Sequence, residues 1–221
     1  MTKREESQYF RKILFLSIFA IAMGYLESAV VVYLRQLYYP DGFSFPLREM
    51  ARKMVIIELA REAATIIMLG AVSVLTARGF WTRFANFIFL FGIWDITYYL
   101  WLKITINWPS SLMESDILFL IPGPWVGPVL APILISVLMV ISGYMITRMG
   151  HHGIVFRPGI KEWIASLLGI IMILYTFLYD ARAIYSGAIP DAYPIWMYII
   201  GLCFCVYGFA SSYRKSRKPR A

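Results

Sequence analysis

The sequence predicts an all-α fold, a polytopic transmembrane helical bundle of about six spans whose fourth span is broken by Pro and Gly near its outer end. Of the 221 residues, 60% are hydrophobic and only 15% are charged. Soluble domains average about 25% charged residues, and one soluble core could not cover so much apolar surface. The 15 Tyr and 7 Trp suit a protein with two membrane interfaces, where amphipathic rings lie at head-group level.

The third observation is the length of the apolar runs. A spanning helix needs about 20 mostly apolar residues. Six runs meet this need, at residues 13–34, 54–77, 84–106, 116–146, 163–184 and 193–211. We therefore expect one integral membrane domain over residues 1–221, with a basic cytoplasmic tail at 212–221.

The first run also allows another interpretation, a cleaved signal peptide. Basic residues precede it, and Ala20-Ile21-Ala22 resembles a small-residue cleavage site. However, the apolar run continues to Leu34, which is longer than a signal peptide requires. We favour a retained helix.

The fourth run, 116–146, is irregular because four prolines interrupt it, at positions 122, 124, 128 and 132. Proline removes a backbone N–H donor, so carbonyl groups here could be free to accept hydrogen bonds. The alternative is a rigid interfacial turn with Trp125 as its anchor. In a five-span alternative, this segment does not cross the membrane.

The distribution of the basic residues predicts that both termini are cytoplasmic. Cytoplasmic loops carry an excess of Lys and Arg. With six spans, fourteen such residues fall on the side of the termini and six on the other. The fourteen are Lys3, Arg4, Arg11, Lys12, Arg78, Arg83, Arg148, Arg157, Lys161, Arg214, Lys215, Arg217, Lys218 and Arg220; the six are Arg35, Arg48, Arg52, Lys53, Lys103 and Arg182. Because these residues flank apolar runs, the net charge of +8 does not indicate nucleic-acid binding.

Ionisable side chains at membrane depth are the strongest functional signal in the sequence. Each costs about 2.5–3.5 kcal/mol on insertion scales, so such groups usually face a bundle interior and have partners. In this topology they fall in the outer half of the bilayer, except Asp95, which lies near the middle of the third span and forms the floor. The set is Glu27, Glu58, Arg61, Glu62, Asp95, Asp116, Asp180 and Arg182. We predict that they meet in one polar pocket.

Helical spacing supports this prediction. Glu58, Arg61, Glu62 and Thr65 lie at i, i+3, i+4 and i+7 on one face of the second span, so Arg61 can pair with either glutamate. The alternative for these charges is an ion-pair network at the membrane interface. For Asp116, Asp180 and Arg182, the alternative is a solvated helix end.

The first span has a ridge of small residues at Ala20, Gly24 and Ser28, which permits close contact between helices. Glu27 lies beside this ridge. We therefore expect it to point toward a neighbouring helix rather than toward lipid.

These patterns assign candidate roles. The catalytic candidates are Glu27, Glu62 and Asp95. The substrate-binding candidates are Glu58, Arg61, Tyr98, Tyr99, Asp116, Trp125, Asp180 and Arg182. A divalent cation could also bind, with Glu27, Glu58, Glu62 and Asp95 as its oxygen ligands. Besides catalysis and cation binding, a third possible use of these residues is anion binding, in which the arginines bind an anionic head group and the carboxylates hold the arginines in place.

The histidines do not suit a membrane-embedded haem. His151 and His152 are the only histidines and fall in a predicted cytoplasmic loop, so no haem is expected.

We expect a multi-pass protein of the inner (cytoplasmic) membrane that binds or acts on a lipid-like or hydrophobic small molecule in an outer-leaflet pocket. The alternatives are a small proton-coupled transporter and a non-catalytic subunit of a membrane complex. Membrane lipid, a hydrophobic small molecule and other membrane proteins are the expected partners.

Overall fold

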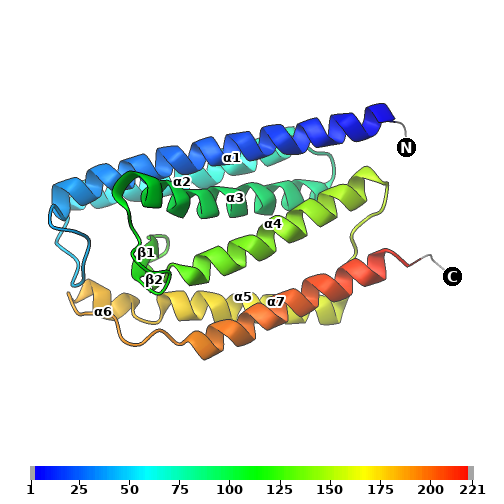
Figure 1. The fold of residues 1–221 in the computed structure, drawn as a ribbon. Helices are drawn as coiled ribbons and strands as arrows, with labels where there is room; N and C mark the ends of the chain where they lie inside the picture. The colour runs from blue at the N-terminus through cyan, green and yellow to red at the C-terminus, as the bar shows by residue number, and fades with distance from the viewer. Residues whose placement is uncertain (1–2, 219–221) are drawn as a thin grey trace.

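The computed structural model describes residues 3–218 and is mostly helical (Figure 1). Its elements are α1 (Lys3–Tyr38), α2 (Arg52–Leu75), α3 (Phe80–Ile106), β1 (Ser115–Phe119), β2 (Trp125–Pro128), α4 (Leu130–His151), α5 (Ile160–Leu178), α6 (Ala181–Tyr185) and α7 (Ile195–Ser216). The long helices run along one axis, and α1 begins at the same end of the bundle where α7 ends (Figure 1). The strand pair and α6 lie toward the opposite end, which we call the hairpin end.

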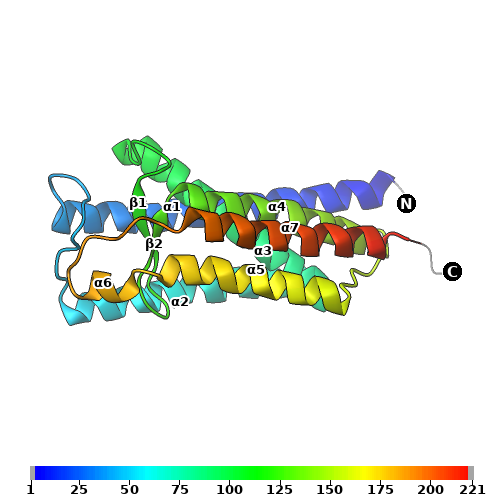
Figure 2. The ribbon, with the colours of Figure 1, turned by 90° about the horizontal axis from the view of Figure 1, so that it is seen from below.

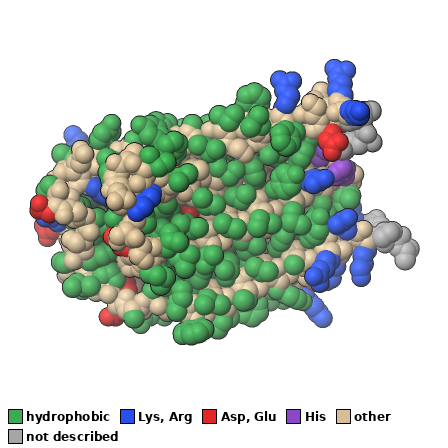
Figure 3. Space-filling view, in the orientation of Figure 1, with side chains coloured by type: hydrophobic (Ala, Val, Ile, Leu, Met, Phe, Trp, Pro, Cys, Tyr) green, Lys and Arg blue, Asp and Glu red, His purple; other side chains and the backbone are tan. Residues whose placement is uncertain are grey.

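Five helices of the described chain are long and apolar enough to cross a membrane: α1, α3, α4, α5 continued through α6, and α7. Together they indicate an integral membrane protein, and hydrophobic side chains cover the middle of the face that Figure 3 shows. The sixth predicted span, α2, is 24 residues long but carries five charged residues. Those residues are Arg52, Lys53, Glu58, Arg61 and Glu62. Composition therefore supports five of the six predicted spans.

Glycines bring neighbouring helices into close contact. A β carbon at Gly24 would collide with Thr97 of α3, and one at Gly143 of α4 would lie 2.8 Å from the β carbon of Phe89. On α1, the neighbouring small residues Ala20 and Ser28 are fully buried as well. The predicted ridge on the first span is therefore the surface on which α1 packs against α3.

The prediction that a helix of the fourth span begins near Asp116 is wrong. Residues 115–128 form an antiparallel hairpin in which Asp116 pairs with Gly127 and Ile117 with Val126, and α4 begins only at Leu130. The proline and glycine residues between the strands suit a turn. Hydrogen bonds between the two strands satisfy part of the backbone N–H and C=O groups of each strand. The hairpin occupies the position expected for the outer part of a broken helix.

Helices α5 and α7 form a pair that lies side by side along the bundle (Figure 2). This pair contacts the rest of the described bundle mainly through α7 on α4 and through α5 on β2. Helix α7 continues to Ser216, beyond the predicted end at Ser211, so part of the predicted tail is helical. Arg220 of that tail lies outside the described residues. His151, expected in a loop, is the last residue of α4.

Candidate functional site

A small polar cavity of about 50 Å³ lies between α1, α2, α3 and β1, toward the hairpin end. Its polar lining consists of Glu27, Arg61, Glu62, Trp94, Asp95 and Tyr98, and residues 117–119 of the hairpin close it. A buried water needs roughly 10–15 Å³ of such space, so the cavity has room for a few waters or one small polar group. Three separate helices thus bring five of the predicted site residues together, and Trp94 joins them.

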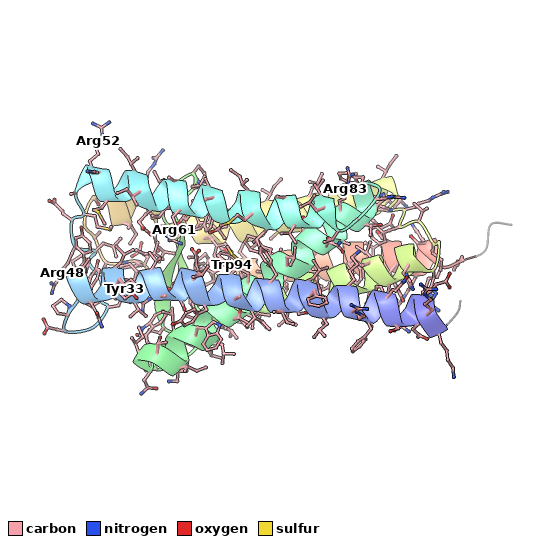
Figure 4. All side chains as sticks on the ribbon, turned by 90° about the horizontal axis from the view of Figure 1, so that it is seen from above. Tyr33, Arg48, Arg52, Arg61, Arg83 and Trp94 are labelled. Atoms are coloured by element: carbon pink, nitrogen blue, oxygen red, sulfur yellow. The ribbon has the colours of Figure 1, made fainter. Side chains whose placement is uncertain are left out.

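Arg61 is the only cation that lines this cavity, and two glutamates share it. Its Nη2 lies 2.8 Å from Glu58 Oε2, its Nε donates to the same oxygen at 2.9 Å, and Nη1 forms an ion pair with Glu27. Thr65 Oγ1 donates to the second oxygen of Glu27 at 3.0 Å. Figure 4 shows Arg61 in the space between α1 and α2. One guanidinium thus pairs with both Glu27 and Glu58, and its single positive charge offsets only one of their two negative charges.

Glu62 and Asp95 have no such partner. The backbone N–H of Leu120 donates to both oxygens of Glu62 at 3.0 Å, and Ser136 Oγ donates to Asp95 Oδ2 at 2.9 Å. No Lys or Arg of the described chain forms an ion pair with either carboxylate. An ionised carboxylate can accept about four hydrogen bonds, so both groups retain unused acceptor positions beside the cavity.

Trp94, by contrast, has a hydrogen-bond donor without an acceptor. It is 4% exposed and lines the cavity, yet its indole N–H has no hydrogen-bond partner in the described part of the chain. An unsatisfied buried donor costs about 1–3 kcal/mol. The site therefore combines underused acceptors with one unused donor. Trp94 was not among the site residues that the sequence predicted.

Asp116 lies outside the cavity, in a separate ion pair that the sequence did not reveal. Arg35 Nη2 lies 3.0 Å from Asp116 Oδ1, and both side chains are buried. The guanidinium carbon also lies 3.6 Å from the ring centroid of Trp108 and 4.7 Å from that of Phe43. This arrangement ties β1 to the end of α1. Arg35 follows Glu27 by two helical turns, and that spacing is the signal by which it could have been found.

The loop before the hairpin is held by Glu114. Trp108 Nε1 donates to Glu114 at 2.6 Å, and the backbone and hydroxyl of Ser110 each donate at 2.8 Å. Partial burial acts to raise the pKa of Glu114, but the hydrogen bonds outweigh it and lower that pKa below its usual value. The loop is thus anchored beside the Arg35–Asp116 pair.

The remaining predicted site residues lie elsewhere. Tyr99 is buried against Leu102 and Val129, beside Tyr98 but not on the cavity wall. Asp180 and Arg182 lie at the junction of α5 and α6 and do not line this cavity; Arg182 is exposed, as a solvated helix end would be. These three residues therefore do not join the site.

The predicted cation site is not assembled. Among residues 3–218, no three His, Cys, Asp or Glu side chains lie close enough together to hold a metal ion. The reason is local: Glu27 and Glu58 point at Arg61, while Glu62 turns to the hairpin backbone. Three of the four carboxylates line the cavity, Glu58 lies outside its lining, and the four do not converge on one point.

A second cavity of about 460 Å³ lies between α3 and α4 on one side and α5 and α7 on the other. Aromatic and aliphatic side chains form nearly all of its wall, from Trp125 and Phe177 near the hairpin to Trp81 and Trp163 near the opposite end. Trp125, predicted to bind substrate, lies here instead of at the carboxylates. Sequence periodicity cannot reveal such a cavity, because it depends on how two helix pairs dock.

Comparisons of the chain with family models, curated proteins and solved structures find no significant match. The functional assignment therefore depends on the two cavities and the residues around them.

Proposed function

We propose that the chain crosses the inner (cytoplasmic) membrane six times, with both termini in the cytoplasm. At 1.5 Å per residue, the 24 residues of α2 extend about 36 Å, enough for a hydrocarbon core of about 30 Å. Glu58 and Glu62 of α2 are buried inside the bundle, so they do not face lipid. Lys and Arg side chains gather at the end where the chain begins and ends (Figure 3), which favours a cytoplasmic position for that end.

Cysteine labelling on the two sides of α2 tests this topology. Asp41 and Arg78 are exposed and flank the helix, so Asp41→Cys and Arg78→Cys are placed in a background where Cys203 and Cys205 are replaced by Ala. We expect a membrane-impermeant maleimide to label position 41 in spheroplasts and position 78 only after permeabilisation. Labelling of both positions from one side would show that α2 does not cross.

We propose further that the polar cavity binds the polar end of a lipid-like or hydrophobic small molecule. The observation that carries this proposal is the imbalance at the cavity: the carboxylates of Glu27, Glu62 and Asp95 line it together with one guanidinium, that of Arg61. A fourth carboxylate, that of Glu58, lies outside the lining and pairs with the same guanidinium. With all groups ionised, four negative charges and one positive charge leave a net charge of −3. A network that served stability alone would balance its buried charges.

The pairing assigns different roles to the acids. Glu27 and Glu58 hold Arg61, so Glu27 is a positioning residue rather than the first catalytic candidate. Glu62 and Asp95 keep free acceptor positions, and they are the groups that contact the ligand or exchange protons with it. Anion binding by arginine receives less support, because Arg61 and Arg35 are both already paired with carboxylates.

Native mass spectrometry of the purified protein, released gently from detergent, tests the binding proposal. We expect the parent to retain a small hydrophobic molecule and Glu62→Gln and Asp95→Asn to lose at least nine-tenths of it. Asp180→Asn is the matched control, since Asp180 is an acid at the same end that lines neither cavity. Equal retention by the parent, Glu62→Gln and Asp95→Asn would show that the carboxylates are structural.

A further inference from the structure

The polar and apolar cavities adjoin along a single layer of side chains. Phe91, on the apolar cavity, contacts Trp94, on the polar one, with ring centroids 5.1 Å apart. Likewise, Phe119 of the polar cavity contacts Trp125 of the apolar cavity at 5.7 Å. One elongated molecule could therefore occupy both cavities if the Phe119 and Trp125 rings move apart.

The residues that line the polar cavity limit which polar end group such a molecule can have. Glu62 and Asp95 can each accept a further hydrogen bond, whereas the Trp94 N–H lacks an acceptor. A pair of hydroxyl groups suits this set, because each hydroxyl donates one hydrogen bond and accepts others. A phosphate would add negative charge to a site that already has an excess of it. With about 50 Å³ available, only a head group of a few non-hydrogen atoms fits.

The apolar cavity restricts the other end. Its volume of about 460 Å³ lies within the range of roughly 300–1,000 Å³ that is common for small-molecule sites. Along α4 it extends from Ile135 to Ile146, about 16 Å at 1.5 Å per residue. Such an elongated apolar space suits one hydrocarbon chain better than a compact ring system.

We propose that the ligand is a neutral long-chain lipid alcohol of the monoacylglycerol type. Its hydroxyl end lies against Glu62, Asp95 and Trp94, and its hydrocarbon chain lies between the α3–α4 and α5–α7 helix pairs. This assignment rests on the proposed function and adds the class of ligand and the position of its chain.

Photo-crosslinking locates the chain. The probe is monooleoylglycerol with a diazirine within the acyl chain, added to the purified protein, and lysophosphatidic acid with the same chain is the charged comparison. We expect the alcohol probe to label residues of the apolar cavity at least tenfold more than the phosphate probe does. Equal labelling by the two probes, or labelling spread evenly over the lipid-facing helix surfaces, would overturn the proposal.

Two neighbouring isoleucines of α5 provide a matched pair of variants. Both side chains are exposed, but only Ile170 lines the apolar cavity. We expect Ile170→Phe to reduce crosslinking in the cavity at least fivefold and Ile171→Phe to leave it unchanged.

The outcomes separate this inference from the proposed function. If Asp95→Asn abolishes ligand binding but Ile170→Phe has no effect, the position of the chain is wrong and the polar site stands. If Glu62→Gln and Asp95→Asn both bind as the parent does, the proposed function fails as well.

Discussion

The two ends of the bundle both bury acidic side chains, but they balance them differently. At the end of the termini, Glu162 is 2% exposed and accepts from Lys215 Nζ at 2.5 Å and from Ser211 Oγ at 2.8 Å. One acid meets one cation there, and the side chain of Lys215 is half exposed. At the hairpin end, three acids line a cavity together with Arg61, and a fourth, Glu58, pairs with the same arginine.

This difference separates a structural ion pair from a candidate site. The charge of Glu162 is balanced by one cation, and a neighbouring hydroxyl donates to the same oxygen, so only its Oε2 atom lacks a hydrogen-bond partner in the described chain. Acids that outnumber their cations beside an open space gain by taking up a ligand, or by holding protons themselves. Burial alone would therefore have been a poor guide, because Glu162 is buried as deeply as Glu62.

Removal of Arg61 should have the largest effect on stability. Arg61→Met leaves Glu27 and Glu58 unpaired, and breaking a buried pair in this way costs about 3–5 kcal/mol. The loss is measured by unfolding in mixed detergent micelles. Arg182→Met, an exposed arginine at the same end, serves as the control and should change stability by less than about 0.5 kcal/mol. A similar loss of stability in Arg61→Met and Arg182→Met would contradict the prediction that Arg61 holds the two buried glutamates.

Two glutamates one helical turn apart should differ in their effects. Glu58→Gln takes a charged partner from Arg61 and should cost about 2 kcal/mol. Glu62→Gln should cost less than about 1 kcal/mol, because an amide oxygen still accepts from the Leu120 N–H and one excess charge disappears. The same unfolding assay measures both. A larger loss for Glu62→Gln would mean that Glu62 is the structural acid.

The smallest effect is expected at the other end. Lys215→Met should lower the unfolding midpoint only slightly, since the side chain is half solvated and Ser211 continues to donate to Glu162. Lys218→Met, also exposed, is the comparison. If Lys215→Met were as damaging as Arg61→Met, the two ends would not differ in the way described.

The sequence predicted the helices and the meeting of Glu27, Arg61, Glu62, Asp95 and Tyr98 because both follow from one-dimensional rules. Apolar length locates membrane helices, and the cost of charge in hydrocarbon drives ionisable groups into a bundle interior. Helical spacing also predicted the shared face of α2 and the small-residue ridge of α1. None of these inferences required knowledge of which helices pack together.

What the sequence did not predict depends on such packing. The Arg35–Asp116 pair joins residues 81 positions apart, and the Ser136–Asp95 hydrogen bond spans 41 positions. The hairpin was missed because a proline-rich segment between apolar runs was interpreted as a broken helix, although Pro122, Gly123 and Pro124 are equally typical of a turn between strands. The apolar cavity arises only when the α5–α7 pair docks.

The most direct test of the central claim is an experimental structure of the protein in lipid nanodiscs supplemented with monooleoylglycerol. We predict that Glu62, Asp95 and Trp94 surround one small polar density that continues into the space between α4 and α5. Carboxylates that point separately into head groups or bulk water, with no density shared between them, would contradict the claim.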